Sequence, residues 1–146
     1  MKKILSVLFF ALALTTSVWA DDVISRDVKK LPVAAQNFIK KNFPKSKVSY
    51  IKIDKDLLEA ATYEAILEDG VQIDFNNKGE WTEIDCKLQP VPAALIPATI
   101  ATYLKNNYPN EIVEKIERDR KGYEVELKHS FTLKFNTKGQ FLRLDD

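Results

Sequence analysis

Hydrophobic and polar residues alternate along two stretches of the chain, residues 63–85 and 123–145. Alternation with a period of two indicates β-strands that bury one face. In the earlier stretch the dipeptide Asp69-Gly70 separates two alternating segments and favours a tight hairpin turn. We therefore predict three antiparallel strands in each stretch, at 63–68, 71–75 and 80–85 and at 123–128, 131–135 and 140–145.

A helical period precedes each stretch, in residues 32–43 and 97–108. Apolar residues recur there at spacings of three and four, which gives each segment one face to bury. Both segments begin at a proline, whose missing N–H group costs nothing in a first helical turn. A weaker strand pattern follows each helix, at 48–53 and 113–116, so each unit contains one helix and about four strands.

The two units resemble each other residue by residue. Positions 63–85 and 123–145 are identical at eight of 23 aligned positions, and the helical segments match at an offset of 65 residues. We interpret this similarity as the tandem duplication of one supersecondary unit. Residues 21–86 would form the first repeat, residues 87–92 a linker and residues 93–146 the second repeat.

The expected fold class is α+β. A sheet with one apolar face needs a cover, and the helix of the same unit supplies it. Two units placed edge to edge would form one sheet of about eight antiparallel strands, with both helices on one face. This arrangement also hides one sheet edge of each unit.

The first twenty residues have the features of a signal peptide. Lys2 and Lys3 precede an apolar run at residues 4–14, and small residues end the segment at Ala20. The apolar run is shorter than the about 20 residues of a membrane-spanning helix. We expect cleavage near Ala20/Asp21 and a periplasmic or secreted protein.

Composition narrows the possible partners. The chain has 22 basic and 21 acidic side chains, a balance that gives no reason to expect nucleic acid or an anionic membrane as the partner. Cys86 is the single cysteine and cannot form an intramolecular disulfide. We interpret it as a free structural thiol.

The sequence contains no catalytic or cofactor-binding motif of a known kind. Carboxylates share one predicted strand face, where solvated charge is a more common meaning than a hydrolase pair: Glu64, Glu68, Asp74, Glu83 and Asp85. The run 74–79 partly matches a calcium loop, but Lys78 stands where an oxygen ligand is required. A hairpin turn accounts for the same run, so we expect no enzyme activity, cofactor or metal site.

The open face of the predicted sheet carries the remaining candidate residues. If Ile84 and Leu144 face the helices, alternation turns Trp81 and Phe141 outward. Aromatic side chains within a polar rim are typical of a binding surface. The candidate apolar anchors on this face are Trp81, Phe141, Tyr50 and Ile66, and the candidate charged residues are Glu64, Glu83, Lys134 and Arg143.

An alternative orientation has equal weight. Trp81 and Phe141 would then pack on the core, and Thr82 and Leu142 would face outward. In both cases the open face is largely acidic in the first repeat and mixed in the second.

A recurring set of motifs resembles a known family. Each unit contains Leu-Pro or Ile-Pro before the helix, an aromatic residue and Pro after it, then Tyr-Glu-x-x-Leu, Phe-Asn and a Lys-Gly turn that leads to an aromatic residue. These motifs resemble the PepSY-like, β-lactamase-inhibitor-like family of secreted bacterial proteins, over about residues 31–145 in two copies. The resemblance implies a concave sheet that is open on one side. Inhibitors of this type grip a target protein with that face.

We therefore expect a non-enzymatic periplasmic or secreted binding module, inhibitor-like in type, whose open sheet face engages a protein or peptide. The alternative hypothesis is an envelope sensor that binds a small ligand or a cell-envelope component between the repeats.

Overall fold

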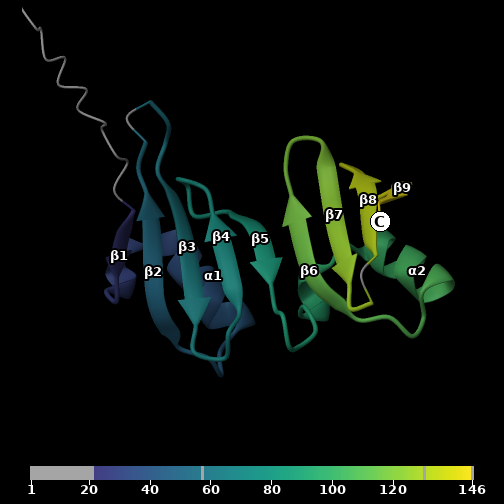
Figure 1. The fold of residues 1–146 in the computed structure, drawn as a ribbon, viewed down its shortest axis with the longest axis horizontal. Helices are drawn as coiled ribbons and strands as arrows, with labels where there is room; N and C mark the ends of the chain where they lie inside the picture. Colours follow the sequence, from purple (N-terminus) through teal and green to yellow (C-terminus); the bar gives the residue numbers. More distant parts are fainter. Residues whose placement is uncertain (1–21, 57, 130, 146) are drawn as a thin grey trace, which may run out of the picture.

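The computed structural model describes residues 22–56, 58–129 and 131–145, so the predicted signal peptide lies outside the described residues. They form one antiparallel sheet whose strands follow chain order from β1 to β9 (Figure 1). The strands are β1 (Val23–Ser25), β2 (Val48–Asp54), β3 (Thr62–Leu67), β4 (Gln72–Phe75), β5 (Trp81–Asp85), β6 (Val113–Arg118), β7 (Gly122–Leu127), β8 (Thr132–Asn136) and β9 (Phe141–Asp145). The helices are α1 (Val33–Asn42) and α2 (Ala98–Asn107), and a short 3₁₀ turn precedes each, η1 (Val28–Lys30) and η2 (Ala93–Leu95).

The predicted α+β class is confirmed, but the expected count of about eight strands was one too low. The additional strand is β1, which pairs with β2 through Val23↔Ile53 and Ser25↔Ile51. With three residues, β1 is too short to show a period of two in the sequence.

One row of apolar side chains crosses the whole sheet and forms the centre of the core. Its members oppose one another in register from β2 to β8, and each is 0% exposed: Ile51, Ala65, Ile73, Ile84, Ile116, Val125 and Leu133. The row runs without a break through the β5–β6 pair, where the first half of the chain meets the second. The two halves therefore share one core.

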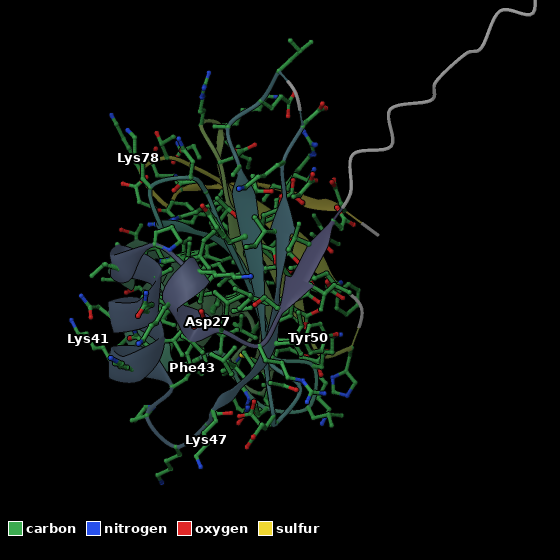
Figure 2. The ribbon with its side chains drawn as sticks, turned by 90° about the vertical axis from the view of Figure 1, so that its left-hand side faces the viewer. Asp27, Lys41, Phe43, Lys47, Tyr50 and Lys78 are labelled. Carbon is green, nitrogen blue, oxygen red and sulfur yellow. The ribbon has the colours of Figure 1, made fainter. Side chains whose placement is uncertain are left out.

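The helices pack on the face that carries this row. Phe38 of α1 meets Phe75 edge-on with ring centroids 5.8 Å apart, and Tyr103 of α2 meets Phe135 in the same way at 5.5 Å. Figure 2 views the sheet from its β1 edge, with α1 against one side. Aromatic pairs in this geometry contribute about 0.5–1.5 kcal/mol each beyond their area burial.

A β-bulge corrects the predicted orientation of Trp81 and Phe141. Strict alternation places residues three apart on opposite faces, but the β4–β5 register shifts between Asp74 and Phe75, and β8–β9 shifts at the equivalent place. The extra residue lets Trp81 and Ile84 face the same side. Trp81 is 8% exposed, and Phe141 stacks on Tyr103 of α2 with centroids 4.7 Å apart. The outward orientation was wrong, because both side chains lie on the helix side. Trp81 packs on the core as in the alternative orientation, whereas Phe141 remains 37% exposed.

Candidate functional site

A row of ionisable side chains crosses the open face, opposite the helices. Cα pairing places its members side by side from β2 to β9: Lys52, Glu64, Asp74, Glu83, Glu117, Glu124, Lys134 and Arg143. We call this set the charged row. Carboxylates occupy every strand from β3 to β7, and cations occupy both ends. The predicted residues Glu64, Glu83, Lys134 and Arg143 all belong to it.

Three carboxylates of the charged row are neutralised by lysines. The Nζ to Oε1 distances are 3.1 Å for Lys52–Glu64, 3.0 Å for Lys115–Glu83 and 2.9 Å for Lys134–Glu124. At the β9 end, Asp145 accepts from both Lys134 and Arg143, at 3.0 and 2.9 Å. This end of the charged row is therefore an internally paired network.

The centre of the charged row holds two carboxylates without a cation. Within the described part of the chain, no lysine or arginine lies within ion-pair distance of Asp74 or Glu117. Burial, with Glu83 next in effect, raises the pKa of Asp74 to about 6. The same two causes raise the pKa of Glu117. Glu83 and Glu117 directly oppose each other, and like charges in this position destabilise a sheet.

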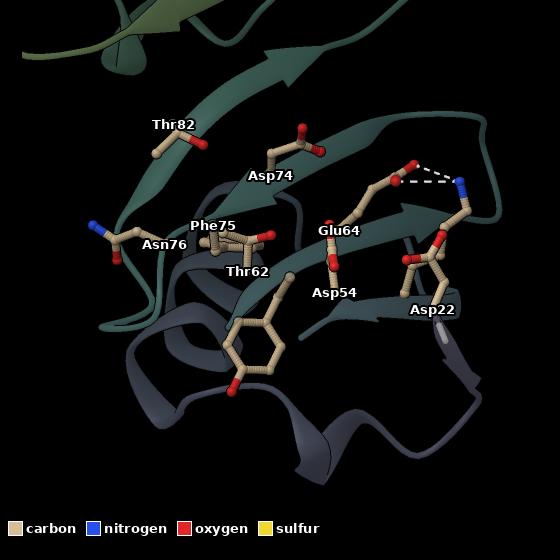
Figure 3. Close-up of a pocket in the computed structure, with 10 residues that line it drawn as sticks. Asp22, Asp54, Thr62, Glu64, Asp74, Phe75, Asn76 and Thr82 are labelled. Atoms are coloured by element: carbon tan, nitrogen blue, oxygen red, sulfur yellow. Dashed lines mark hydrogen bonds and ion pairs between the residues drawn. The ribbon is translucent and has the colours of Figure 1, made fainter. Parts of the chain in front are cut away.

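A hollow of about 360 Å³ opens beside Asp74 (Figure 3). Four carboxylates line it, from Asp22, Asp54, Glu64 and Asp74, together with a single cation, Lys52. The dashed lines in Figure 3 mark the two hydrogen bonds from Lys52 to Glu64. We call this space the acidic hollow, because one lysine cannot balance its carboxylates.

The second half has a hollow at the equivalent place, with different charge. It measures about 300 Å³, and its lining includes Lys121, Glu124, Lys134 and Arg143. Lys134 stands where the first half has Asp74. The equivalent positions 74 and 134 therefore differ in the sign of their charge, in line with the acidic and mixed open faces that the sequence predicted.

Tyr50 and Ile66, two of the predicted apolar anchors, lie on the open face next to the charged row. They oppose each other on β2 and β3, and both are partly buried. Tyr50 also lines a hollow of about 410 Å³ with Ile24, which is 66% exposed. Apolar surface therefore adjoins the acidic part of the open face.

The helix side holds a groove between the two halves, and the sequence did not predict Arg118 and Tyr123 among its lining residues. The guanidinium of Arg118 lies 3.9 Å above the Trp81 ring, and its Nε donates to the Trp81 carbonyl oxygen at 2.7 Å. A hollow of about 630 Å³ adjoins them, lined also by Tyr123 and by residues of η2 and the start of α2. Burial lowers the pKa of Arg118. Residues 81 and 118 come together through the β5–β6 pairing, and no motif in the sequence indicates that pairing.

The run 74–79 forms a hairpin turn. Asn76 Oδ1 accepts from the N–H groups of Lys78 and Glu80, both at 3.0 Å. Among the residues with described positions, no group of three or more His, Cys, Asp or Glu side chains could hold a metal ion. Cys86 is buried, and burial raises the pKa of its thiol to about 11, so the thiol stays protonated and unreactive near neutral pH.

No helix in the described ranges is both long and apolar enough to cross a membrane.

A sequence model of one protein family matches residues 61–143, and that family is described as "Putative beta-lactamase-inhibitor-like, PepSY-like". The match confirms the resemblance that the sequence motifs predicted. No curated protein is significantly similar to the chain.

Three solved structures of Bacteroides proteins each match 86% of this chain. A Bacteroides vulgatus protein described as periplasmic and of unknown function is 50% identical, with a TM-score of 0.83 over 100% of its length. A Bacteroides thetaiotaomicron protein described as a "putative calcium-regulated periplasmic protein" is 44% identical, with a TM-score of 0.81 over 98% of its length. A second Bacteroides vulgatus protein is 38% identical, with a TM-score of 0.80 over 98% of its length.

Proposed function

The chain belongs to the PepSY-like, β-lactamase-inhibitor-like family, and we propose that it is a non-enzymatic periplasmic binding module whose open sheet face engages a cationic segment of a protein or peptide. The proposal includes export by a signal peptide cleaved near Ala20/Asp21 and an origin by tandem duplication. The periplasmic descriptions of the similar Bacteroides proteins support the location.

The observation that carries the proposal is the uncompensated negative charge at the centre of the charged row. Asp74 and Glu117 are partly buried next to Glu83, and the pKa of each is raised. A sheet that only faced water would be more stable with neutral residues or cations at these positions. A lysine or arginine from a partner would relieve the repulsion among these carboxylates. Because this relief occurs only in the complex, it would contribute favourably to the free energy of binding.

The apolar neighbours of the charged row complete the proposed surface. Tyr50, Ile66 and Ile24 offer an apolar contact beside the acidic hollow, and Lys134 and Arg143 mark the cationic limit at the other end. The proposed ligand segment is therefore basic with at least one apolar side chain. Trp81 and Phe141 are not part of this surface, because they face the helices.

A peptide-binding experiment tests the proposal. Calorimetry would compare a Lys- and Leu-containing decapeptide with a Glu- and Leu-containing one, at low and at physiological salt. The cationic peptide should bind in a salt-dependent manner. The double variant Asp74→Asn/Glu117→Gln should weaken binding about fivefold or more, because two charge contacts of about 0.5–1 kcal/mol each are lost.

The matched control is Glu59→Gln/Glu68→Gln, which removes two exposed carboxylates outside the charged row. This control should bind the cationic peptide nearly as the wild type does. Equal binding of both peptides, or equal losses in the two double variants, would remove the charged row as the binding surface.

The groove beside Arg118 favours a second candidate, a sensor that binds a small anionic ligand or envelope component between the halves. Among the described residues, no carboxylate forms an ion pair with the terminal guanidinium nitrogens of Arg118. The guanidinium itself lies above the Trp81 ring. A melting-temperature screen of carboxylate amphiphiles tests this candidate, because a ligand of the folded state raises its stability. A stabilising amphiphile should lose its effect in Arg118→Met, and persistence of the effect would exclude the groove.

A further inference from the structure

Strands β5 and β9 occupy equivalent places in the two halves. Each follows an Asn-x-Lys-Gly turn, and each pairs with the preceding strand through the same bulged register. Their outer edges differ. The outer edge of β5 pairs with β6, whereas no strand in the described part of the chain pairs with the outer edge of β9.

The missing neighbour leaves apolar surface uncovered on β9. Ile84 of β5 is 0% exposed, but Leu144 at the equivalent position of β9 is 41% exposed. Trp81 is 8% exposed beneath Arg118 of β6, and Phe141 is 37% exposed. An open edge strand with exposed apolar residues is a template for pairing with another chain.

The β5–β6 junction shows what a strand on that edge would place against β9. At this junction Ile84 opposes Ile116, Asp85 opposes Lys115 and Glu83 opposes Glu117. By the same register, a strand added to β9 needs an apolar residue opposite Leu144 and a basic residue opposite Asp145. An acidic residue opposite Arg143 would complete the set.

Strand β9 itself meets these three requirements. When two β9 strands run antiparallel about Leu144, Leu144 opposes Leu144 of the second copy. Arg143 then opposes Asp145 of the second copy, and Asp145 opposes its Arg143. The edge is therefore complementary to itself in both charge and apolarity.

We propose that two copies of this chain associate through antiparallel pairing of β9, with the two-fold axis at Leu144 and perpendicular to the sheet. The interface is isologous and closed, so it produces a dimer rather than a filament. The sheet continues from one copy into the other, with all helices on one side. Both open faces lie on the other side, which gives the dimer a surface twice as wide.

The other sheet edge is a poorer candidate. Strand β1 has three residues, and in a sheet of alternating strands β1 and β9 run in the same direction. Head-to-tail contact between copies would thus join β9 to β1 in parallel, whereas all pairings within this sheet are antiparallel. The two-fold contact through β9 keeps the antiparallel pattern.

Sedimentation equilibrium and light scattering of the purified protein over a concentration series test the proposal. The wild type should show a concentration-dependent mass that reaches twice the monomer mass. Leu144→Lys should raise the dissociation constant at least tenfold, because two cations would meet at the axis. Leu88→Lys is the matched control, since Leu88 is 93% exposed outside the sheet, and it should leave the dimer unchanged.

Charge-reversal variants distinguish a loss of β9–β9 pairing from a loss of the folded structure. Arg143→Asp should raise the dissociation constant at least tenfold, because two carboxylates would then face each other across the axis on both sides. The exchange Arg143→Asp/Asp145→Arg should restore dimerisation, with circular dichroism confirming the fold of each variant. A wild type that remains monomeric at the highest concentration, a dimer that survives Leu144→Lys, or an exchange that does not restore the dimer would overturn the proposal.

Discussion

Ile84 and Leu144 hold the same position in two equivalent strands, yet one is fully buried and the other is 41% exposed. Both oppose a buried residue of the preceding strand, Ile73 for β5 and Leu133 for β9. What differs is the next strand, because β6 lies beside β5 and β9 is at the sheet edge. The burial of a residue in a sheet therefore depends on the strands on both sides of it. Equivalent positions in the two halves can have different surroundings even where their sequences are similar.

A second difference lies on the opposite face. Asp74 and Lys134 are equivalent in register, since each opposes the glutamate of a Tyr-Glu pair, Glu64 or Glu124. Lys134 forms an ion pair with that glutamate, whereas Asp74 repels it. The helix-facing side is apolar in both halves, whereas this position of the open face carries opposite charges in the two halves. This difference supports our proposal that the open face binds the partner.

The largest expected effect breaks the equivalence of β5 and β9. Ile84→Ala should lower the free energy of unfolding by about 2–5 kcal/mol, because it leaves a cavity in the central apolar row. Leu144→Ala should cost less than about 1 kcal/mol, because the side chain is already partly in water. Urea unfolding in an Arg143→Asp background keeps self-association out of the comparison. Equal losses of unfolding free energy in the two variants would show that Leu144 contributes as much to stability as Ile84, despite its exposure.

The turn glycines give a smaller contrast between the halves. Gly79 and Gly139 have φ of 79° and 75°, so Gly→Ala should cost about 1 kcal/mol at each from backbone strain. At Gly79 an added Cβ would also lie 2.9 Å from the backbone nitrogen of Ala35, whereas at Gly139 its nearest neighbour is the Thr99 side chain at 3.1 Å. Overpacking should add about 1–3 kcal/mol at Gly79.

Thermal unfolding of the two variants measures this contrast. Gly79→Ala should have the lower melting temperature. The reverse order of melting temperatures would mean that the contact between the Gly79 turn and α1 accommodates an added methyl group at a lower free-energy cost than the contact between the Gly139 turn and α2.

The sequence predicted the elements that local chemistry determines and missed those that depend on pairing. Most helices and strands could be predicted from local patterns: the prolines before the helices, the alternation in the strands and the Asn-x-Lys-Gly turns. The bulge that turns Trp81 toward the core lies in the register between two strands, which no single strand reveals. Glu117 joined the charged row only through the β5–β6 pairing, because the sequence predicted its strand to end at residue 116. Arg118 was missed for the same reason.

The smallest expected effect sharpens the contrast between Asp74 and Lys134, and it has a definite pH dependence. The pKa of Asp74 is raised to about 6 in the fold, so its ionised form destabilises the protein above that pH and the penalty disappears as the pH falls toward the unfolded value of about 3.9. Asp74→Asn should therefore raise the free energy of unfolding at pH 7 by about 1 kcal/mol, a value reduced from the full shift because the group is partly exposed. At pH 4 the substitution should have little effect.

Lys134→Gln should act in the opposite direction, because its pKa is raised by hydrogen bonds to Glu124 and Asp145. A lysine with a raised pKa stabilises the fold throughout the range below about 10.4, so its loss should lower stability at pH 7. Urea unfolding of both variants at pH 4, 5, 6 and 7 measures the pair. Two changes of the same sign at pH 7, or an Asp74→Asn gain that does not fade between pH 6 and pH 4, would contradict the assignment. Opposite signs would show that the two equivalent positions, which share the same register, make opposite contributions to stability.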